Sequence, residues 1–515
     1  MTHIEKEQAP KPASLYSKEP SSSVSRRYFL GMGIGALFAV TACDSAEPSP
    51  GTPDTTPAAT SVTPKTEAPQ LRVTVDALFK NDPFYIAHRG SGDNWVEHTM
   101  EAYTRSVDAG ALAIEVSVRS TSDGVLVCHH DANTMRTTGI DKPIAQTTWA
   151  ELSKVRNDAR EWLGPAAAIQ PVPLLKDVLD KFSATMVLFI EDKADTNTHQ
   201  LLDLMDTYPE SKSHFVWKQW AGSKPGRVAA KRGYLRWGYI TEDLIPRVAE
   251  LAPEFDYLGV NAGFTDQQMK QVVALGKPVI CWEVHRRSQR DHLVKLGVQG
   301  MMCSNIPHVT SSTALATRDS FGTGMRAAGD LPSIADRGWG YQPVIDQQQA
   351  SLLMNGLSDS YLMGSLGPLA HPEFDLSFDM RWPLELPTGQ HGGGIAFGVA
   401  DDAPYLSTRP GTSAGHHLLL RRNGLLELYG RKGEPDADKL LASVQTSPIR
   451  PGQWVAIDVK VRDGMVSVMR DGDPQWAVSV PGTVAGDGYI SLVKDYSNGA
   501  SLEYRRIELG HRAGN

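Results

Sequence analysis

The stretch ALAIEVSVRSTSDGVLVCHHD, residues 111–131, gathers a carboxylate, a hydroxyl and two imidazoles around one tight turn. Glu115 and Ser117 lie two residues apart on its first arm, and His130 lies on its second arm. Side chains alternate along a strand, so Glu115 and Ser117 share one face. A carboxylate can hold a cation and an imidazole can transfer protons. The stretch therefore predicts a site that binds a cation and transfers protons.

Charged side chains also end two other apolar runs. His88 and Arg89 end FYIAHRG, and Glu191 and Lys193 end MVLFIEDK. Singly, each has an ordinary structural explanation as a turn residue or a partner of an ion pair. Together, two carboxylates can bind a hard cation, two imidazoles can exchange protons, and an arginine can form paired hydrogen bonds with a phosphate. The combination suits cleavage of a phosphodiester.

The elements that must position these groups alternate between apolar runs and helical patterns, from about residue 82 to residue 312. This alternation is typical of a parallel α/β fold. The candidate strands are FYIAHRG, ALAIEVSV, MVLFIEDK, HFVWKQW, YLRWGYI, YLGVN, PVICWEV and GMMCS. Their number predicts an α/β TIM barrel, (β/α)8, in which polar residues near the carboxyl ends of the strands face the mouth.

The run GVLVCHH follows Ser122-Asp123-Gly124 too closely for a crossover helix. We therefore expect it to return antiparallel to ALAIEVSV as a hairpin arm. A hairpin centred between Ser122 and Asp123 pairs residues whose numbers sum to about 245. In that register Glu115 faces His130.

Residues 325–515 change to repeated strands and turns. Asn423-Gly424 and Asp463-Gly464, each flanked by alternating apolar residues, are strong hairpin signals. They predict an all-β, antiparallel sandwich of the jelly-roll, lectin-like kind. Its larger aromatic residues could line a glycan site, although core packing is the commoner role for any one of them. These residues are Trp454, Trp476 and Tyr489.

The N-terminal segment, residues 1–43, resembles an export signal. Arg26 and Arg27 precede an apolar run that stops at Cys43, which is shorter than the roughly 20 residues of a spanning helix. The paired arginines resemble a twin-arginine signal, and VTAC resembles a lipoprotein acylation site. We expect an exported protein held by a lipid on Cys43 at the outer face of the cell membrane; the alternative is a cleaved signal and a secreted protein. Residues 44–75, rich in Pro and Thr, predict a tether.

The composition of the chain also bears on the class of protein and on its partners. The chain has 41% hydrophobic and 21% charged residues and a net charge of -8, which is typical of ordinary globular domains. No basic cluster suggests a nucleic-acid partner. Beyond Cys43 the three cysteines cannot all pair with one another, and we expect Cys128, Cys281 and Cys303 to be small buried hydrophobic residues. We place the barrel at residues 76–320.

An ordered series of motifs across roughly residues 84–310 resembles the glycerophosphodiester phosphodiesterases, which belong to the phospholipase C-like TIM-barrel group. In chain order the matching stretches are IAHRG, EHT, IEVSV, SDGVLVCHHD, MRTTG, VPL, FIEDK, ICWEV and CSNIP. Such a series is more specific than any single motif. The resemblance does not extend to the tether or to the sandwich.

This resemblance implies a TIM-barrel hydrolase that expels an alcohol from a glycerol-linked phosphodiester and leaves glycerol phosphate. His88 and His130 would be the general acid and base. The substrate would be bound by Arg89, Lys193 and Trp282. Arginine and cations near the phosphate would offset the charge that grows on the phosphoryl oxygens.

The resemblance also implies a divalent cation, Ca²⁺ or Mg²⁺, held by Glu115 and Glu191, with Glu97 as a supporting residue. Ser117 is a departure, because the family usually has a metal-binding aspartate there. As a metal ligand, Ser117 offers at most a neutral oxygen or positions a water. Losing one carboxylate removes a full charge from the cation site.

Two smaller departures and two compensating residues accompany Ser117. His98 replaces the asparagine of E-N-T, and Ser304-Asn305 replaces T-D. The missing charge at the cation site could be supplied by Asp131, by Asp192 or by water.

Two functions from different classes stay open. The first is a surface-anchored, metal-dependent phosphodiesterase acting on glycerophosphodiesters or on teichoic-acid-like cell-wall polymers. The second is a catalytically degenerate barrel that only binds such headgroups, with the lectin-like sandwich binding cell-wall glycans. The retained histidines and carboxylates favour the enzyme, and fold alone does not decide between the two.

Overall fold

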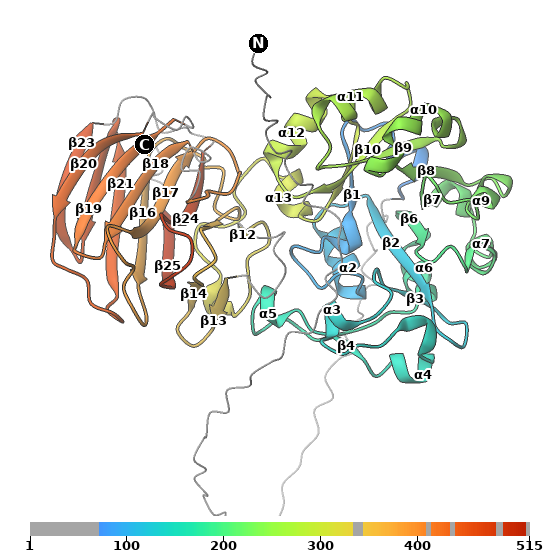
Figure 1. The fold of residues 1–515 in the computed structure, drawn as a ribbon, viewed down its shortest axis with the longest axis horizontal. Coiled ribbons are helices and arrows are strands. Elements are labelled where there is room, and N and C mark those ends of the chain that lie inside the picture. Colours follow the sequence, from blue (N-terminus) through green and yellow to red (C-terminus); the bar gives the residue numbers. More distant parts are fainter. Residues whose placement is uncertain (1–71, 333–342, 408–413, 433–437, 480–487, 511–515) are drawn as a thin grey trace, which may run out of the picture. The chain divides into compact units, whose positions relative to one another are not determined.

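The computed structural model describes residues 72–332, 343–407, 414–432, 438–479 and 488–510 (Figure 1). The predicted export signal with Cys43, and the tether up to residue 71, lie outside these residues, so both stay predictions. Within the described residues, no helix has the length and apolar character needed to cross a membrane.

Eight parallel strands close into a barrel, which confirms the predicted fold class. Each strand pairs with its neighbour in parallel, and Ala87 of the first strand pairs with Ile114 of the second to complete the ring. Figure 1 shows helices on the outside of these strands. In chain order the barrel strands are β1 (Phe84–Ala87), β2 (Ala113–Ser120), β6 (Val187–Asp192), β7 (Phe215–Trp220), β8 (Leu235–Tyr239), β9 (Tyr257–Asn261), β10 (Val279–Val284) and β11 (Gly300–Cys303).

The helices between these strands bury one apolar face each against the barrel. In α6, for example, Leu175, Val178, Leu179 and Phe182 are buried at helical spacing. The helices of eight or more residues are α2 (Met100–Asp108), α6 (Leu175–Phe182), α7 (Thr198–Asp206), α11 (Asp266–Val273) and α12 (Arg287–Lys295). Shorter helices are α1 (Val75–Leu78), α3 (Met135–Thr138), α4 (Trp149–Leu152), α5 (Arg160–Leu163), α8 (Ser211–His214), α9 (Arg227–Lys231), α10 (Val248–Leu251) and α13 (Ile306–Thr310).

The interior of the barrel changes from apolar to charged along each strand. In β6 the inward residues are Val187, Phe189 and Glu191 in turn, because alternate side chains share a face. Val187 and Phe189 belong to an inner apolar cluster that also contains Val75 and Leu78 of α1. The later inward position therefore holds the charge, at the carboxyl end of the strands, where barrel active sites are built.

Strand β3 (Leu126–Cys128) pairs antiparallel with β2, as predicted, but the predicted register is wrong by one residue. Val118 pairs with Cys128, because the Thr121 N–H bonds to the Val125 carbonyl and leaves three residues in the turn. The pairing ends at Cys128, so His130 lies beyond the hairpin and does not face Glu115. A second small hairpin joins β4 (Arg156–Asn157) and β5 (Gln170–Pro171).

In the described residues that follow the barrel, two seven-stranded antiparallel sheets form the β domain. Their apolar faces share one core, in which Phe374 of one sheet meets Phe397 of the other. Hairpins form at Asn423-Gly424 and Asp463-Gly464, as predicted. One sheet contains β12 (Leu331–Pro332), β15 (Ser360–Leu362), β24 (Tyr489–Lys494), β17 (Gly392–Val399), β18 (Gly415–Arg421), β19 (Leu425–Arg431) and β20 (Lys439–Gln445). The other contains β13 (Val344–Asp346), β14 (Ser351–Met354), β25 (Leu502–Gly510), β16 (Phe374–Arg381), β21 (Val455–Arg462), β22 (Met465–Arg470) and β23 (Asp473–Ser479).

A buried carboxylate of the β domain, Asp402, caps a helix of the barrel domain. Its oxygens accept the N–H groups of Arg287 and Ser288 at the start of α12, at 2.6 and 3.1 Å. The same side chain lies 2.8 Å from Nε2 of the buried His308. These N–H groups have no partner inside the helix, so the carboxylate satisfies donors that would otherwise be unpaired.

The three cysteines of the barrel, Cys128, Cys281 and Cys303, are buried and form no disulfide. This agrees with the prediction that they act as small hydrophobic residues. Burial also raises the pKa of each thiol, so none is poised as a nucleophile.

Candidate active site

One row across three neighbouring strands brings together the polar side chains of the barrel mouth. Ser117 pairs with Glu191, and Glu191 pairs with Lys218 of β7. Glu115 lies two residues before Ser117 on the same face of β2. All four side chains are buried, with Glu115 and Ser117 fully inaccessible. The structure therefore brings together the three predicted metal ligands, and it places the Lys218 side chain among them.

The Lys218 ammonium lies between the two carboxylates. Its Nζ is 2.7 Å from Oε1 of Glu115 and 2.8 Å from Oε2 of Glu191. Burial disfavours the charged ammonium, but Glu115 and Glu191 outweigh burial and raise the pKa of Lys218. Burial alone would raise the pKa of Glu191, whereas Lys218 and Lys193 lower it to about 2. The three groups form a charged cluster at neutral pH.

The remaining carboxylate contacts come from donors around the mouth. Glu115 accepts hydrogen bonds from the Arg89 backbone N–H at 3.0 Å and from the Ser117 hydroxyl at 2.9 Å. Glu191 accepts hydrogen bonds from the Tyr239 hydroxyl at 2.8 Å and from Lys193 Nζ at 3.1 Å. Both carboxylates are thus neutralised and hydrogen-bonded by the protein itself.

A divalent cation needs several oxygen ligands with lone pairs directed at it. Here the Ser117 hydroxyl points its hydrogen at Glu115, and Lys218 stands where a cation would bridge Glu115 and Glu191. The described residues contain no group of three or more His, Cys, Asp or Glu side chains that could hold a metal ion. As they stand, these side chains do not fit a divalent cation. Metal ligation by Glu115, Glu191 and Ser117 stays a prediction, and it requires Lys218 to move.

The two aspartates expected to supply the missing charge are engaged elsewhere. Asp131 binds His130 and Arg136, at 2.8 and 2.7 Å. Asp192 accepts the Asn197 N–H at 2.8 Å and the Thr198 hydroxyl at 3.1 Å, beside the start of α7.

His88 is held by a serine at the end of β11. Its Nδ1 lies 2.9 Å from the Ser304 hydroxyl, and that hydroxyl donates to Oε2 of Glu283 at 3.0 Å. Because Ser304 gives its hydrogen to Glu283, the serine oxygen accepts from Nδ1–H of His88. This tautomer leaves the Nε2 lone pair of His88 free to take a proton.

His130 is oriented by its neighbour in the same way. Its Nδ1 lies 2.8 Å from Oδ1 of Asp131, which fixes Nδ1 as the protonated nitrogen. Burial, and then the positive charge of Arg89, lower the pKa of His130 to about 3, so the ring is neutral at physiological pH. The adjacent His129 is different, because its two ring nitrogens contact the Asp131 carbonyl and the Thr137 hydroxyl. Only His130 of this pair is oriented as a proton acceptor.

Arg89 is placed by its backbone as well as by its side chain. Its φ of 53° lies in the left-handed region, which non-glycine residues rarely adopt, and its N–H binds Glu115. The guanidinium lies 3.4 Å from Oε1 of Glu97, which Arg136 holds with two hydrogen bonds of 2.6 and 2.8 Å. Among the residues described, Arg89 Nε is buried without a hydrogen-bond partner. Arg89 therefore retains a donor for an incoming anion.

Aromatic side chains line the mouth beside these charges. Trp282 of β10 is half-buried and packs edge-on against Tyr239 and Trp237, with ring centroids 5.3 and 6.1 Å apart. Lys218 lies 5.8 Å from the Tyr239 ring. The predicted contact of Trp282 with substrate stays a prediction, and its place beside Tyr239 is compatible with that role.

Sequence reasoning missed the roles of several residues at this mouth: Lys218, Tyr239, Arg136 and Glu283. A signal was present for Lys218, since a lysine inside the apolar strand HFVWKQW is costly unless it is paired. His98, a departure from the family motif, bonds through Nδ1 to the Tyr103 hydroxyl at 2.7 Å and takes no direct part in the cluster.

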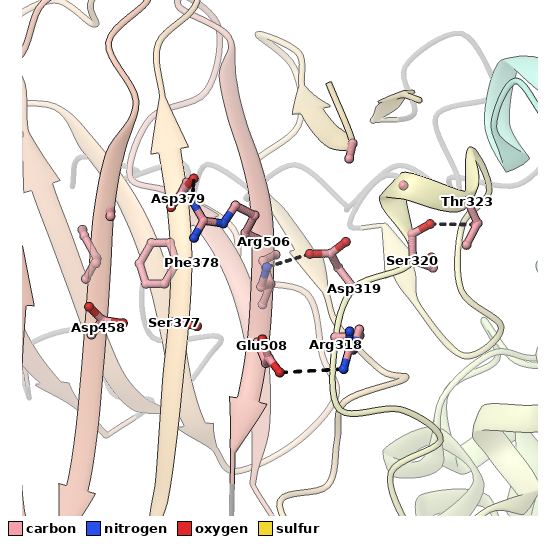
Figure 2. Close-up of a pocket in the computed structure, with 15 residues that line it drawn as sticks. Arg318, Asp319, Ser320, Thr323, Ser377, Phe378, Asp379, Asp458, Arg506 and Glu508 are labelled. Carbon is pink, nitrogen blue, oxygen red and sulfur yellow. Dashed lines mark hydrogen bonds and ion pairs between the residues drawn. The ribbon is translucent and has the colours of Figure 1, made fainter. Parts of the chain in front are cut away.

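A hollow of about 460 Å³ lies on the β domain between β16, β21, β25 and the segment 318–323. Figure 2 shows Arg506 reaching toward Asp379 and Arg318 reaching toward Glu508. The Arg506–Asp379 and Arg318–Glu508 contacts are 3.3 and 3.9 Å long. Charged groups therefore line this hollow, and Phe378 behind them is buried.

The aromatic residues considered for a glycan site pack elsewhere. Trp454 lies between the guanidinium groups of Arg381 and Arg505, 4.3 and 4.0 Å from its ring. Trp476 and Tyr489 belong to, or pack against, apolar clusters of the β domain. The positions of Trp476 and Tyr489 agree with the predicted core-packing role, whereas Trp454 stacks between two arginine side chains.

Comparison with known proteins matches residues 88–218 to the Glycerophosphoryl diester phosphodiesterase family. A glycerophosphodiester phosphodiesterase of Arabidopsis thaliana is 47% identical over 58 residues, 11% of this chain and 16% of that protein. One of Bacillus altitudinis is 30% identical over 130 residues, 25% of this chain and 52% of that protein. The chain thus spans about half, or less, of the length of these relatives.

A solved phosphodiesterase of Oleispira antarctica, in complex with the product sn-glycerol-3-phosphate, is also similar to this chain. It is 20% identical, with a TM-score of 0.39, and the match covers 45% of this chain and 97% of that one.

Proposed function

Because residues 88–218 match the Glycerophosphoryl diester phosphodiesterase family, we propose that the protein is a phosphoric diester hydrolase acting on glycerophosphodiesters. It releases an alcohol and leaves glycerol phosphate. The observation that supports this most directly is the orientation of two imidazoles: His88 and His130 each commit Nδ1 to a neighbour and keep Nε2 for proton transfer.

In the proposed reaction, His130 is the base, since the neutral ring can accept a proton from the attacking hydroxyl of water or of the glycerol. His88 is the acid: in its imidazolium form Nδ1–H bonds to Ser304, and Nε2 carries the proton that is donated. The proton passes from Nε2 of His88 to the leaving alkoxide. Arg89 binds the phosphoryl oxygens through its free Nε, and the nearby Lys193 ammonium offsets the charge that grows on them.

Enzymes of this family typically use a divalent metal. A Ca²⁺ or Mg²⁺ ion would enter between Glu115 and Glu191 only after displacing the Lys218 ammonium. No step of the proposed reaction is therefore assigned to a metal.

The cellular setting is also part of this proposal. Arg26-Arg27 and the VTAC sequence support export and a lipid on Cys43. The lipid would hold the enzyme at the outer face of the cell membrane, near teichoic-acid-like polymers. In that setting the lectin-like β domain would bind a cell-wall glycan. Cys43→Ala should release the protein from the membrane fraction, and continued sedimentation with membranes would argue against the anchor.

One observation favours a second function, a barrel that binds phosphodiester headgroups without cleaving them: Lys218 neutralises both carboxylates expected to hold a metal. Incubating purified protein with glycerophosphocholine, with Ca²⁺, with Mg²⁺ and with a chelator, separates the two functions. Release of glycerol phosphate that is lost in His130→Ala supports the enzyme. Saturable binding of glycerophosphocholine without release under any of these conditions supports the binding module.

A further inference from the structure

We propose that the Lys218 ammonium replaces the divalent cation at the barrel mouth, so that this site works without a metal. The catalytic part of this inference rests on the proposed phosphodiesterase function, whereas the structural part does not. Three features of the described residues support it: the position of Lys218, the charge balance of the cluster, and the identity of residue 117.

The position of Lys218 is that of a bridging cation. Its Nζ contacts Glu115 at 2.7 Å and Glu191 at 2.8 Å, which joins the carboxylates of two neighbouring strands. Strand pairing places Lys218 level with Glu191, so the contact is built into the register of the barrel. Only 8% of the Lys218 side chain is exposed, so solvent does not draw the ammonium away.

The charges of the cluster cancel without a metal ion. Glu115 and Glu191 supply two negative charges, and Lys218 and Lys193 supply two positive charges at neutral pH. Adding a divalent cation would leave the buried cluster with an excess of two positive charges, which is costly where water is excluded.

Ser117 fits this balance. An aspartate there would add a third negative charge that a divalent cation could use, but that the two ammonium groups could not neutralise. Instead, the serine hydroxyl donates to Oε1 of Glu115 at 2.9 Å, the same oxygen that contacts Lys218. Lys218 and Ser117 thus act together: the lysine supplies the positive charge at the site, and the serine avoids an additional negative charge.

The ammonium also has a positioning role. Lys218 and Ser117 hold Oε1 of Glu115, which leaves Oε2 to bind the Arg89 backbone N–H at 3.0 Å. That bond supports Arg89 in its left-handed conformation next to His88. Lys218 therefore acts on the phosphate-binding and acid-base groups through Glu115, as a bound cation would.

Calorimetric titration with Ca²⁺ and Mg²⁺ tests the inference without relying on turnover. We expect no binding to the wild-type protein. Ser117→Asp/Lys218→Ser restores three carboxylates and removes the competing ammonium, so it should gain binding at least roughly tenfold tighter than the weakest affinity that the titration detects. The matched control Ser117→Asp/Lys270→Ser removes an exposed lysine elsewhere and should not gain binding, because Lys218 still blocks the site.

Turnover adds a second measurement. Chelator-treated wild-type protein should keep its full rate on glycerophosphocholine, whereas any activity of the Ser117→Asp/Lys218→Ser variant should depend on added metal. Wild-type binding of Ca²⁺ or Mg²⁺ that disappears in Glu191→Gln would overturn the inference even if the double variant does not fold. Loss of wild-type turnover on chelation, restored by metal, would overturn it as well. Absence of turnover in every condition, together with absence of metal binding, would refute the phosphodiesterase but support the replacement of the cation.

Discussion

Ser304 accepts a hydrogen bond from Nδ1 of His88 at 2.9 Å and passes its own hydrogen to Glu283 at 3.0 Å. A residue singled out in the sequence only as a departure from the family motif therefore determines which nitrogen of the proposed acid is available. The Ser304 hydroxyl thus connects the His88 imidazole to the Glu283 carboxylate through two hydrogen bonds.

We expect Ser304→Ala to lower kcat on a glycerophosphodiester by about fivefold, because loss of one hydrogen bond of about 1 kcal/mol frees the ring to rotate or change tautomer. Ser304→Thr keeps the hydroxyl and should recover most of the rate. Steady-state kinetics measure both variants. Equal losses in Ala and Thr would show that packing, and not the hydroxyl, matters at this position.

Removing either proposed acid-base histidine should reduce kcat far more. We expect His88→Ala and His130→Ala each to lose roughly 10²-fold or more while remaining folded by circular dichroism. His129→Gln is the matched control, since His129 contacts the Asp131 carbonyl and the Thr137 hydroxyl and transfers no proton. A wild-type rate in His88→Ala or His130→Ala would remove that histidine from the mechanism.

How much of this site could be predicted depended on whether the information was local. The strands containing Glu115 and Glu191 were predictable, because each is a short apolar run whose polar residue falls on an inward position. The contact of Lys218 with both was not, since it depends on the register between β6 and β7, which no local pattern in either strand records.

The hairpin and the β domain show the same limit. Asp123-Gly124 predicted a turn, but the register changed by one residue because the Thr121 N–H closes the loop on Val125. The cap that Asp402 places on α12 joins residues more than a hundred positions apart, and no periodicity or motif indicates such a pair.

His285 should make stability depend on pH. Burial opposes its charge, but Asp93, at 2.6 Å, and Glu283 raise the pKa of His285 to about 10. The folded state then holds a proton that the unfolded chain, with an ordinary pKa of about 6.5, releases. The stabilisation is fully present below about pH 6.5 and is lost as pH rises through 10.

The matched variant for this prediction is His285→Gln. Measured by chemical denaturation, its unfolding free energy should fall below that of the wild type by roughly 2 kcal/mol at pH 6, after allowance for the partial exposure of His285. The difference should narrow between pH 7 and 10. A constant difference over this range would show that His285 does not retain the extra proton.

Asp402 offers the sharpest test of how the β domain stabilises the barrel domain. Its carboxylate accepts hydrogen bonds from the N–H groups of Arg287 and Ser288 and contacts His308, and both Asp402 and His308 are buried. We expect Asp402→Ala to lower the unfolding free energy by about 2 kcal/mol, as the loss of a helix cap does. Asp402→Asn should lower the unfolding free energy less, because the amide oxygen can still accept the N–H groups.

Because Asp402 contacts none of the proposed catalytic groups, kcat on a small diester measured below the melting range should stay within about twofold of wild type in both variants. An unchanged unfolding free energy in Asp402→Ala would show that this contact does not stabilise α12. A large loss of kcat in a folded Asp402→Asn would show that the β domain affects catalysis.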